Sequence, residues 1–327
     1  MNPEKPQYDV VVIGGGPAGL AAALVLGRAR RSVLLTDAGR PRNRHSAAVH
    51  GYLTRDGTPP EELLAAGRAE VDSYGVERAE DAVTAVAHDV DGFRVTLAGG
   101  RTATARRVVA ATGLTDHLPD VAGLAERWGR DVLHCPYCHG HEVRDQQLTI
   151  IAGDSAGAIH QALLLRQWSE DLTLLLHDVD AAELDPHERR LLDARGVAML
   201  PGRVTAVLTE GDRLTGLRLA DGTTVRCAAV FAPLQFSVND GPLAGLGPEH
   251  HVDDMGTSLA TDAEGRTSVP GLWAVGNVAD LSAQVLDAAA SGARAAIGIN
   301  GELSLEDAEN ALAVGAAPSD GGRSPDR

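Results

Sequence analysis

The sequence is short of several residue types, and each shortage narrows its class. Aromatic residues make up 3% of the 327 residues, and acidic residues outnumber basic ones by 45 to 29, which gives a net charge of −16. Such a chain has little attraction for nucleic acid or for an anionic membrane. No apolar run approaches the ~18 residues of a membrane helix, and the opening MNPEKPQ lacks the apolar stretch of a signal peptide. We expect a cytoplasmic protein without nucleic-acid or membrane partners.

Cysteine is also scarce, with three residues in the chain. Cys227 stands alone in an apolar stretch and is expected to be a packing residue. Cys135 and Cys138 form a Cys-x-x-Cys motif, which in a reducing compartment indicates redox catalysis or a metal site rather than a structural disulfide. Zinc would use the flanking His134 and His139, but no second Cys-x-x-Cys motif is present to complete its coordination. We therefore predict a redox pair and no metal.

The apolar run YDVVVIG predicts a strand that leads into a glycine-rich turn and a helix over 17–29. In the G-x-G-x-x-G pattern, Gly14 permits the tight turn, Gly16 lets the backbone approach a pyrophosphate, and Gly19 allows close helix–strand packing. Asp37 ends the next strand, where its carboxylate can accept hydrogen bonds from a ribose. These elements predict a dinucleotide site formed by Gly14, Gly15, Gly16, Pro17, Ala18, Gly19, Asp37 and Ala38.

Two segments repeat the pattern of earlier ones. The strands and turns from Val204 echo those from Val83, and LTIIAGDSAGAIHQALLL echoes the opening strand–glycine–helix unit. The first unit is completed only near the C-terminus, by GLWAVGN and an alanine-rich helix. We predict an α/β fold of two dinucleotide-binding, Rossmann-like three-layer domains, the second inserted into the first. The predicted ranges are 1–117 with 230–314 and 118–229, with crossings near 118–120 and 232–234 and a disordered tail over 315–327.

The segment Gly271 to Asn277, GLWAVGN, resembles the second FAD motif of the flavoprotein reductases that have two dinucleotide domains. That motif is a strand ending in Ala-x-Gly-Asp beside the flavin ribityl chain, and Asn277 here keeps a hydrogen-bonding group but not the charge. Ala111-Thr112-Gly113 matches the Ala-Thr-Gly strand end of the same family. The resemblance implies FAD as the cofactor, with the helix from about Gln284 directed at the flavin. Its further expected contacts are Arg42, Asn43, His50, Val83, Ala111, Thr112, Gly113, Gly276, Asn277, Gln284 and Val285.

The whole chain is similar to low-molecular-weight thioredoxin reductase, although His139 stands where that family has an Asp after the second Cys. The string Cys-Pro-Tyr-Cys-His-Gly, with Arg42-Asn43 and the segment from Gly51 to Gly57, more specifically resembles the thioredoxin-reductase-like dithiol oxidases of gliotoxin and holomycin biosynthesis. This resemblance implies a homodimer that closes a disulfide in a small-molecule dithiol and passes the electrons through FAD to O2, with H2O2 as product.

Roles are expected for the residues around the motif, and those of the two cysteines follow from the same resemblance. Cys138 is expected to face the flavin and Cys135 to exchange with the substrate. His139 or His134 is the expected base, and Asp287 is expected to orient a histidine, although a solvated acid is an equal alternative. The alternative function is an NADPH-dependent thioredoxin reductase, which runs the electrons in the opposite direction.

The inserted unit argues against NADPH. Ile151 replaces the first glycine of the expected Gly-x-Gly-x-x-Ala turn, where its side chain would obstruct the pyrophosphate. At the end of the next strand, where the reductases carry a His-Arg-Arg cluster for the 2′-phosphate, the chain has Asp178 and Asp180, and two carboxylates would repel a phosphate. NADPH is therefore expected to bind poorly, and NADH is disfavoured but not excluded.

Overall fold

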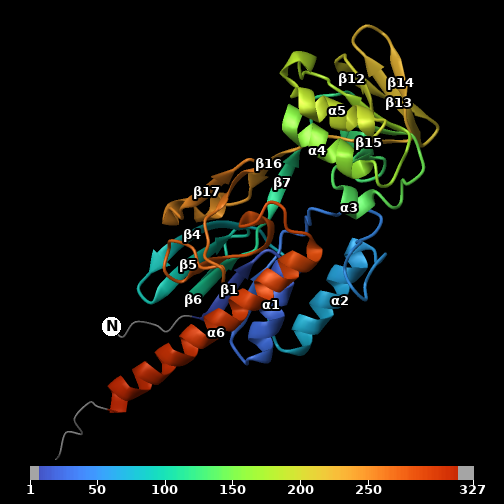
Figure 1. The fold of residues 1–327 in the computed structure, drawn as a ribbon. Helices are drawn as coiled ribbons and strands as arrows, with labels where there is room; N and C mark the ends of the chain where they lie inside the picture. The colour runs from blue at the N-terminus through green and yellow to red at the C-terminus, as the bar shows by residue number, and fades with distance from the viewer. Residues whose placement is uncertain (1–6, 316–327) are drawn as a thin grey trace, which may run out of the picture.

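The computed structural model of the chain describes residues 7–315, and its two main sheets lie in separate parts of the molecule (Figure 1). The first sheet contains β1 (Tyr8–Ile13), β2 (Val33–Thr36), β3 (Glu77–Ala79), β4 (Val83–Asp89), β5 (Gly92–Leu97), β6 (Thr102–Ala110) and β19 (Leu272–Ala274). Its order is β3-β2-β1-β6-β5-β4, and β19 pairs with the C-terminal half of β6. β1 and β2 are nearly continuous buried apolar runs because both faces of this sheet are covered.

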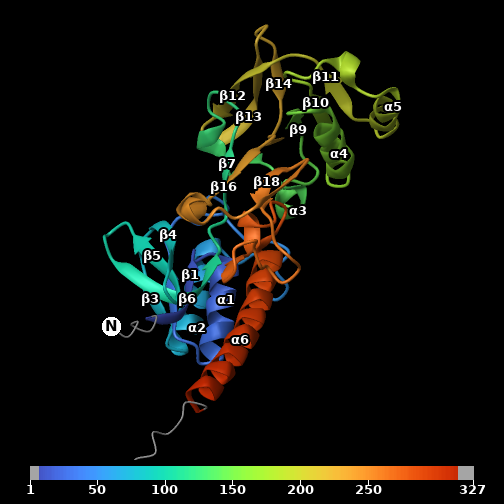
Figure 2. The same cartoon turned by 90° about the vertical axis from the view of Figure 1, so that its left-hand side faces the viewer.

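Three helices cover one face of the first sheet: α1 (Pro17–Arg28), α2 (Pro60–Ser73) and α6 (Val285–Gly315). The long α6 lies along α1 in both views (Figures 1 and 2). A Cβ on Gly292 of α6 would lie 2.0 Å from the carbonyl oxygen of Ala18, so a glycine is required for this close approach. Alternate residues of β1 point to opposite faces: Val10 and Val12 pack under the helices, while Val11 packs against β4–β6. The result is a three-layer unit of helices, parallel sheet and antiparallel meander.

The second part repeats this arrangement. Its parallel sheet is ordered β11-β10-β9-β15-β8, built from β8 (Val132–Leu133), β9 (Leu148–Ile151), β10 (Leu172–Leu175), β11 (Ala198–Leu200) and β15 (Ala229–Phe231). Its meander consists of β12 (Val204–Glu210), β13 (Arg213–Leu219) and β14 (Thr224–Arg226), and its helices are α3 (Pro136–His139), α4 (Ser155–Leu165) and α5 (Pro186–Ala194). The predicted repeat of strand, glycine turn, helix and meander is confirmed, as is the α/β fold of two Rossmann-like units.

Two adjacent strands connect the parts. β7 (Leu114–His117) leaves the first unit and β16 (Gln235–Val238) returns to it, and the two pair antiparallel between the parts (Figure 1). After β16, the chain forms a hairpin, β17 (His250–Asp253) and β18 (Gly256–Leu259), and then enters the first sheet through β19. The second unit is thus an insertion in the first. Short 3-10 turns lie at η1 (Ala125–Arg127), η2 (Ala181–Glu183), η3 (Gly241–Leu246) and η4 (Gly276–Val278).

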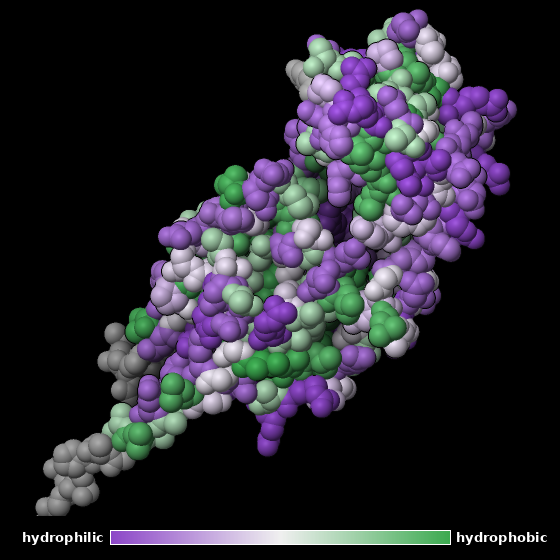
Figure 3. Space-filling model, in the orientation of Figure 1, coloured by the Kyte–Doolittle hydropathy of each residue, from purple (hydrophilic) through white to green (hydrophobic). Residues whose placement is uncertain are grey.

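The exact domain limits stay a prediction. The range 118–229 would divide β15, which pairs with β9 and β8 of the second sheet, so we propose the later crossing near 232–234 as the end of the insertion. Gly315 ends α6, and the rest of the expected disordered tail lies outside the described residues. No helix within residues 7–315 combines the length and apolar character needed to cross a membrane. Hydrophilic residues cover much of the face shown in Figure 3, with apolar residues in scattered groups.

Candidate active site

The glycine turn after β1 leaves the N-terminus of α1 open. Gly16 is the N-cap of α1 and supplies no capping side chain, and a Cβ at this position would meet no atom within 4 Å. Gly14 has φ +109°, and a Cβ on Gly19 would lie 1.8 Å from the carbonyl oxygen of Gly14, so these two glycines are required by the turn itself. The free backbone N–H groups of the first helical turn, together with the open space above Gly16, suit a pyrophosphate.

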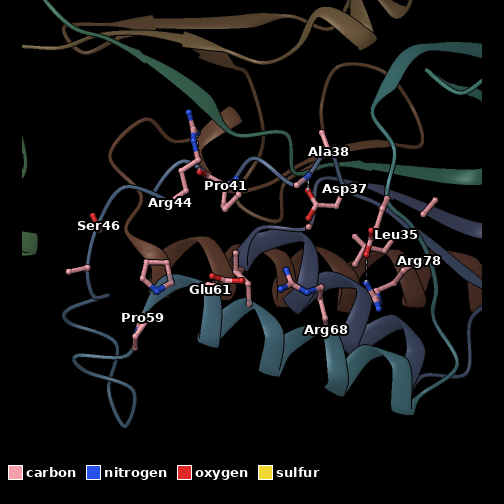
Figure 4. Close-up of a pocket in the computed structure, with 17 residues that line it drawn as sticks. Leu35, Asp37, Ala38, Pro41, Arg44, Ser46, Pro59, Glu61, Arg68 and Arg78 are labelled. Atoms are coloured by element: carbon pink, nitrogen blue, oxygen red, sulfur yellow. Dashed lines mark hydrogen bonds and ion pairs between the residues drawn. The ribbon is translucent and has the colours of Figure 1, made fainter. Parts of the chain in front are cut away.

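A cavity of about 730 Å³ extends from this turn across β2 and α2 (Figure 4). Its lining includes Gly15, Asp37 and Ala38 of the predicted dinucleotide site, and a Cβ on Gly15 would lie 2.5 Å from the Asp37 carboxylate. Sequence reasoning missed other lining residues, among them Arg44, Ser46, Glu61, Arg68, Arg78 and Glu80. Arginine side chains favour bound phosphate groups. These arginines come from three separate segments, and no local motif marks them.

The flavin end of the predicted site contains an unpaired polar atom. Thr112 Oγ1, just after β6, is buried and has no hydrogen-bond partner in the described structure, so a ligand hydroxyl or carbonyl there would satisfy it. The backbone of Thr112 and Gly113 is held by Asn239, which donates through Nδ2 to the Thr112 carbonyl at 3.1 Å and through its backbone N–H to Gly113 at 3.0 Å. Asn239 is a further residue that the sequence did not single out. The open turn, the arginines and Thr112 fit FAD.

Asn277 shows why an amide can stand in place of the usual acid. Its Nδ2 donates to the carbonyl oxygens of Asp280 at 3.0 Å and Ala283 at 2.9 Å, which a carboxylate could not do. Its Oδ1 accepts a hydrogen bond from Arg42 Nη1 at 3.3 Å. Arg42 also donates to both carboxylate oxygens of Asp116 on β7, at 2.7–3.1 Å, so it forms an ion pair with the strand that connects the two parts.

The other predicted cofactor residues lie at different places. The carbonyl of Asn43 accepts the Ser46 N–H at 3.0 Å within the turn that leads to the cavity. Val83 is buried in the core of the first unit and is not among the residues that line the cavity. Gln284 precedes α6 and Val285 begins it, while Gly276 has φ +68°. Their contacts with FAD stay predictions.

Cys135 is the N-cap of α3 and Cys138 lies within this short helix. Cys138 Sγ donates to Cys135 Sγ at 2.7 Å. This hydrogen bond, helped by the backbone N–H groups of Cys138 and Tyr137 and by the charge of Arg42, lowers the pKa of Cys135 to about 7. The donated bond and burial raise the pKa of Cys138 above its usual range. Cys135 is therefore the readily ionised thiol.

Both flanking histidines are half-buried, and burial lowers the pKa of each below its ordinary value. His134 Nδ1 lies 3.1 Å from the carbonyl oxygen of Ala232, which assigns the proton to Nδ1 and leaves Nε2 as an acceptor. His139 Nε2 lies 3.5 Å from Ser46 Oγ, on the loop that also lines the FAD cavity. At neutral pH both rings are uncharged and can accept a proton.

Two predicted site residues have other partners in the structure. His50 lies between two carboxylates, with Nδ1 3.5 Å from Asp56 and Nε2 3.5 Å from Glu142 of the inserted unit. Asp287 accepts the backbone N–H of Gln284 at 3.1 Å, the return bond of a capping box at the start of α6. It makes no hydrogen bond or ion pair with a histidine of the described chain, so its predicted orienting role gains no support.

In the inserted unit, the helix N-terminus that corresponds to that of α1 is capped by a side chain. Asp154 is the N-cap of α4, and its Oδ1 accepts the Gly157 N–H at 2.7 Å. A Cβ on Gly153 would lie 2.5 Å from Pro233, so the turn is closely covered as well. After β10, His177 Nε2 lies 3.2 Å from Asp178, and Arg203 lies 3.5 Å from the same carboxylate. Asp180 caps η2 through the Ala182 N–H. A carboxylate therefore occupies the position where the first unit leaves its helix open.

Known proteins match this fold along most of its length. The family model described as pyridine nucleotide-disulphide oxidoreductase matches residues 8–296. A probable thioredoxin reductase of Arthroderma benhamiae is 32% identical over 95% of this chain and 84% of that protein. Thioredoxin reductase sirT of Leptosphaeria maculans is 31% identical over 90% of this chain and 93% of that protein. The crystal structure of HlmI is 48% identical, with a TM-score of 0.88 over 94% of this chain and 96% of HlmI.

These matches extend through both units and include the Cys-x-x-Cys segment. The family resemblance drawn from GLWAVGN and the cysteine motif is thereby confirmed, and with it FAD as the cofactor. The chain belongs to the pyridine nucleotide-disulphide oxidoreductase family, as an FAD-binding, thioredoxin-reductase-like disulfide oxidoreductase.

Proposed function

We propose that the protein oxidises a small-molecule dithiol to its intramolecular disulfide through Cys135 and Cys138, with O2 as the final electron acceptor. The single observation that supports this direction of electron flow is the position of Asp154. Its carboxylate caps α4 at the site where a nicotinamide dinucleotide would place its pyrophosphate, so its negative charge disfavours the binding of NADPH. With NADPH disfavoured, a thiol substrate is the electron donor that we propose for the cysteine pair.

The thiol steps use the oxidised cysteine pair. A substrate thiolate attacks Cys135 Sγ, which forms a mixed disulfide and releases Cys138 as a thiolate. The second substrate thiolate then attacks the substrate sulfur already bonded to Cys135, which closes the product disulfide and releases Cys135 as a thiolate. A thiol of low pKa leaves faster, and the backbone N–H groups of Cys138 and Tyr137, which lower the pKa of Cys135, favour this release. The reaction moves two electrons and two protons from the dithiol onto the enzyme.

His139 and His134 are the bases available for the two substrate protons. Burial keeps both rings neutral near pH 7, and His139 directly follows Cys138. His139 also contacts Ser46 at the edge of the cofactor cavity, which gives its proton a route toward that cavity. FAD held at the α1 turn would supply the redox chemistry that passes the electron pair of the enzyme dithiol on to O2, and the two released protons would complete H2O2.

The second candidate is an NADPH-dependent thioredoxin reductase, which the names of the relatives from Arthroderma benhamiae and Leptosphaeria maculans favour. In that function the same cysteine pair reduces a protein disulfide and NADPH supplies the electrons. We also propose that the enzyme works as a homodimer, as the resemblance implied, and in the reducing, cytoplasmic setting expected from the sequence.

The test supplies dithiothreitol and O2 without any nicotinamide, and follows peroxide together with oxidised dithiothreitol. We expect equal amounts of the two products, and no activity in the Cys135→Ser/Cys138→Ser variant. Cys227→Ala is the matched control, because Cys227 is buried outside the site and burial raises its pKa to about 12. Peroxide formation that continues undiminished in the double variant would show that the cysteine pair is not used. Rapid anaerobic bleaching of the flavin by NADPH would favour the reductase instead.

A further inference from the structure

We propose that Arg42 and Asp116 form an electrostatic positioning pair for the redox centre, in which Arg42 stabilises the thiolate of Cys135 and Asp116 both anchors Arg42 and limits its field. This gives Arg42 a role toward the thiols in addition to the cofactor contact expected from the sequence. The role rests on the proposed thiol chemistry at Cys135.

Arg42 is held in a single place by three kinds of contact. Its guanidinium makes a fork with Asp116, with Nη2–Oδ1 at 2.7 Å and Nε–Oδ2 at 3.0 Å. Nη1 donates to Asn277, and the guanidinium carbon lies 5.3 Å from the ring centre of Phe236 on β16. A cation fixed on both edges and on one face has little freedom, so its field at a neighbouring group is constant.

The same contacts direct Arg42 toward the cysteine pair. The ring of Phe236 meets the ring of His134 edge-on at 5.7 Å, and His134 directly precedes Cys135. Asp116 and Phe236 lie on the paired strands β7 and β16, opposite each other in register, so the strands between the two units present the pair to the inserted unit. Arg42 is therefore linked by direct contact to Asn277 of the predicted ribityl site, and through the ring of Phe236 to His134, the residue before Cys135.

Two side chains act on the ionisation of Cys135. Cys138 on α3 donates a hydrogen bond to its sulfur, and the positive charge of Arg42 favours its thiolate. Arg42 and Asp116 act with opposite sign on the pKa of His134, and Glu142 and His50 bear on His139. Since Arg42 is the cation common to Cys135, Cys138 and His134, removing it changes the balance of the whole centre.

The pair predicts shifts of opposite sign, which a merely structural role would not produce. A unit charge roughly 10 Å away, at an effective dielectric constant of about 40, moves a titration by about half a pH unit. Arg42→Met removes the cation and should raise the midpoint of Cys135 ionisation by about that amount. Asp116→Asn keeps the side-chain shape, leaves the cation uncompensated, and should lower the midpoint. The double variant should return close to the parent value.

The experiment measures the rate of Cys135 alkylation by iodoacetamide against pH in the reduced holoprotein, with the modified peptide identified by mass spectrometry. Arg94→Met is the matched control, because it breaks an Arg–Asp pair on the β4–β5 hairpin, with Nη2–Oδ2 at 2.7 Å, away from the site. Arg42→Lys keeps the charge and should retain most of the parent midpoint, which guards against a loss of folding in Arg42→Met. Parallel shifts in both single variants, or an Arg42→Met midpoint equal to that of the control, would overturn the proposal. The titration needs no dithiol substrate, so a failed oxidase assay with the expected shifts would refute the proposed function alone.

Discussion

Replacement of Gly16 by valine tests the cofactor site with little disturbance of the fold. Gly16 has φ −75° and ψ −176°, an extended conformation that valine adopts readily, and a Cβ there meets no protein atom within 4 Å. The side chain would instead fill the space at the N-terminus of α1 that is expected to hold the FAD pyrophosphate. We therefore expect Gly16→Val to fold normally and to purify without colour.

The magnitude follows from the contacts that valine would displace. A hydrogen bond from a backbone N–H to a charged phosphate oxygen contributes about 1.5–3 kcal/mol, and the helix N-terminus adds about 0.3–1 kcal/mol. Loss of two such bonds and the helix term corresponds to about 3–7 kcal/mol, or roughly a 10²- to 10⁵-fold increase in the Kd for FAD. The stability of the apoprotein should change by about 1 kcal/mol or less.

The assay compares flavin absorbance per protein and the Tm of the apoprotein with those of Gly301→Val. Gly301 lies on α6 of the same unit, and a Cβ there also meets no atom within 4 Å. This control should remain yellow, whereas Gly16→Val should be colourless with a similar Tm after FAD removal. A Gly16→Val protein that keeps its full FAD content would refute the assignment of the pyrophosphate to this turn.

Three other predictions concern the inserted unit and the histidines. NADPH should reduce the flavin much more slowly than the dithiol does, and Asp154→Ala should increase that rate; stopped-flow reduction at the turnover rate in the parent would contradict this. His139→Ala should slow the thiol step by ~10²–10⁴ if this ring is the base, while His134→Ala serves as the comparison. Burial depresses the pKa of both histidines, so the unfolded chain binds protons that the folded chain does not as the pH falls below ~6.5. Stability should be constant above that pH and decrease below it by at most ~1.4 kcal/mol per pH unit for each ring, and urea midpoints in His139→Gln should depend less on pH.

Local sequence determined a large part of this protein. The strand, glycine turn and helix around Gly14–Gly19 are adjacent in the chain, and the two required glycine positions follow from the turn geometry alone. The repeat of the two units could be predicted from the sequence because the hydrophobic pattern of strands and helix is complete within each unit. The Cys-x-x-Cys motif could be recognised from four consecutive residues. Asp154 directly precedes a helix and can be predicted as its N-cap from the sequence alone, as can the residues Ile151, Asp178 and Asp180 that disfavour NADPH.

The tertiary structure alone decided which distant residues meet. The loop that carries Arg42 reaches Asp116, 74 residues further on, because β7 leaves the sheet beside that loop, and no sequence pattern records this meeting. His50 and Glu142 are brought together by packing of the loop against the inserted unit, and the cavity arginines come from separate segments. Local propensity and residue spacing predict structure only over the length of one helix or strand. Contacts between units depend instead on how the paired strands β7 and β16 set one unit against the other.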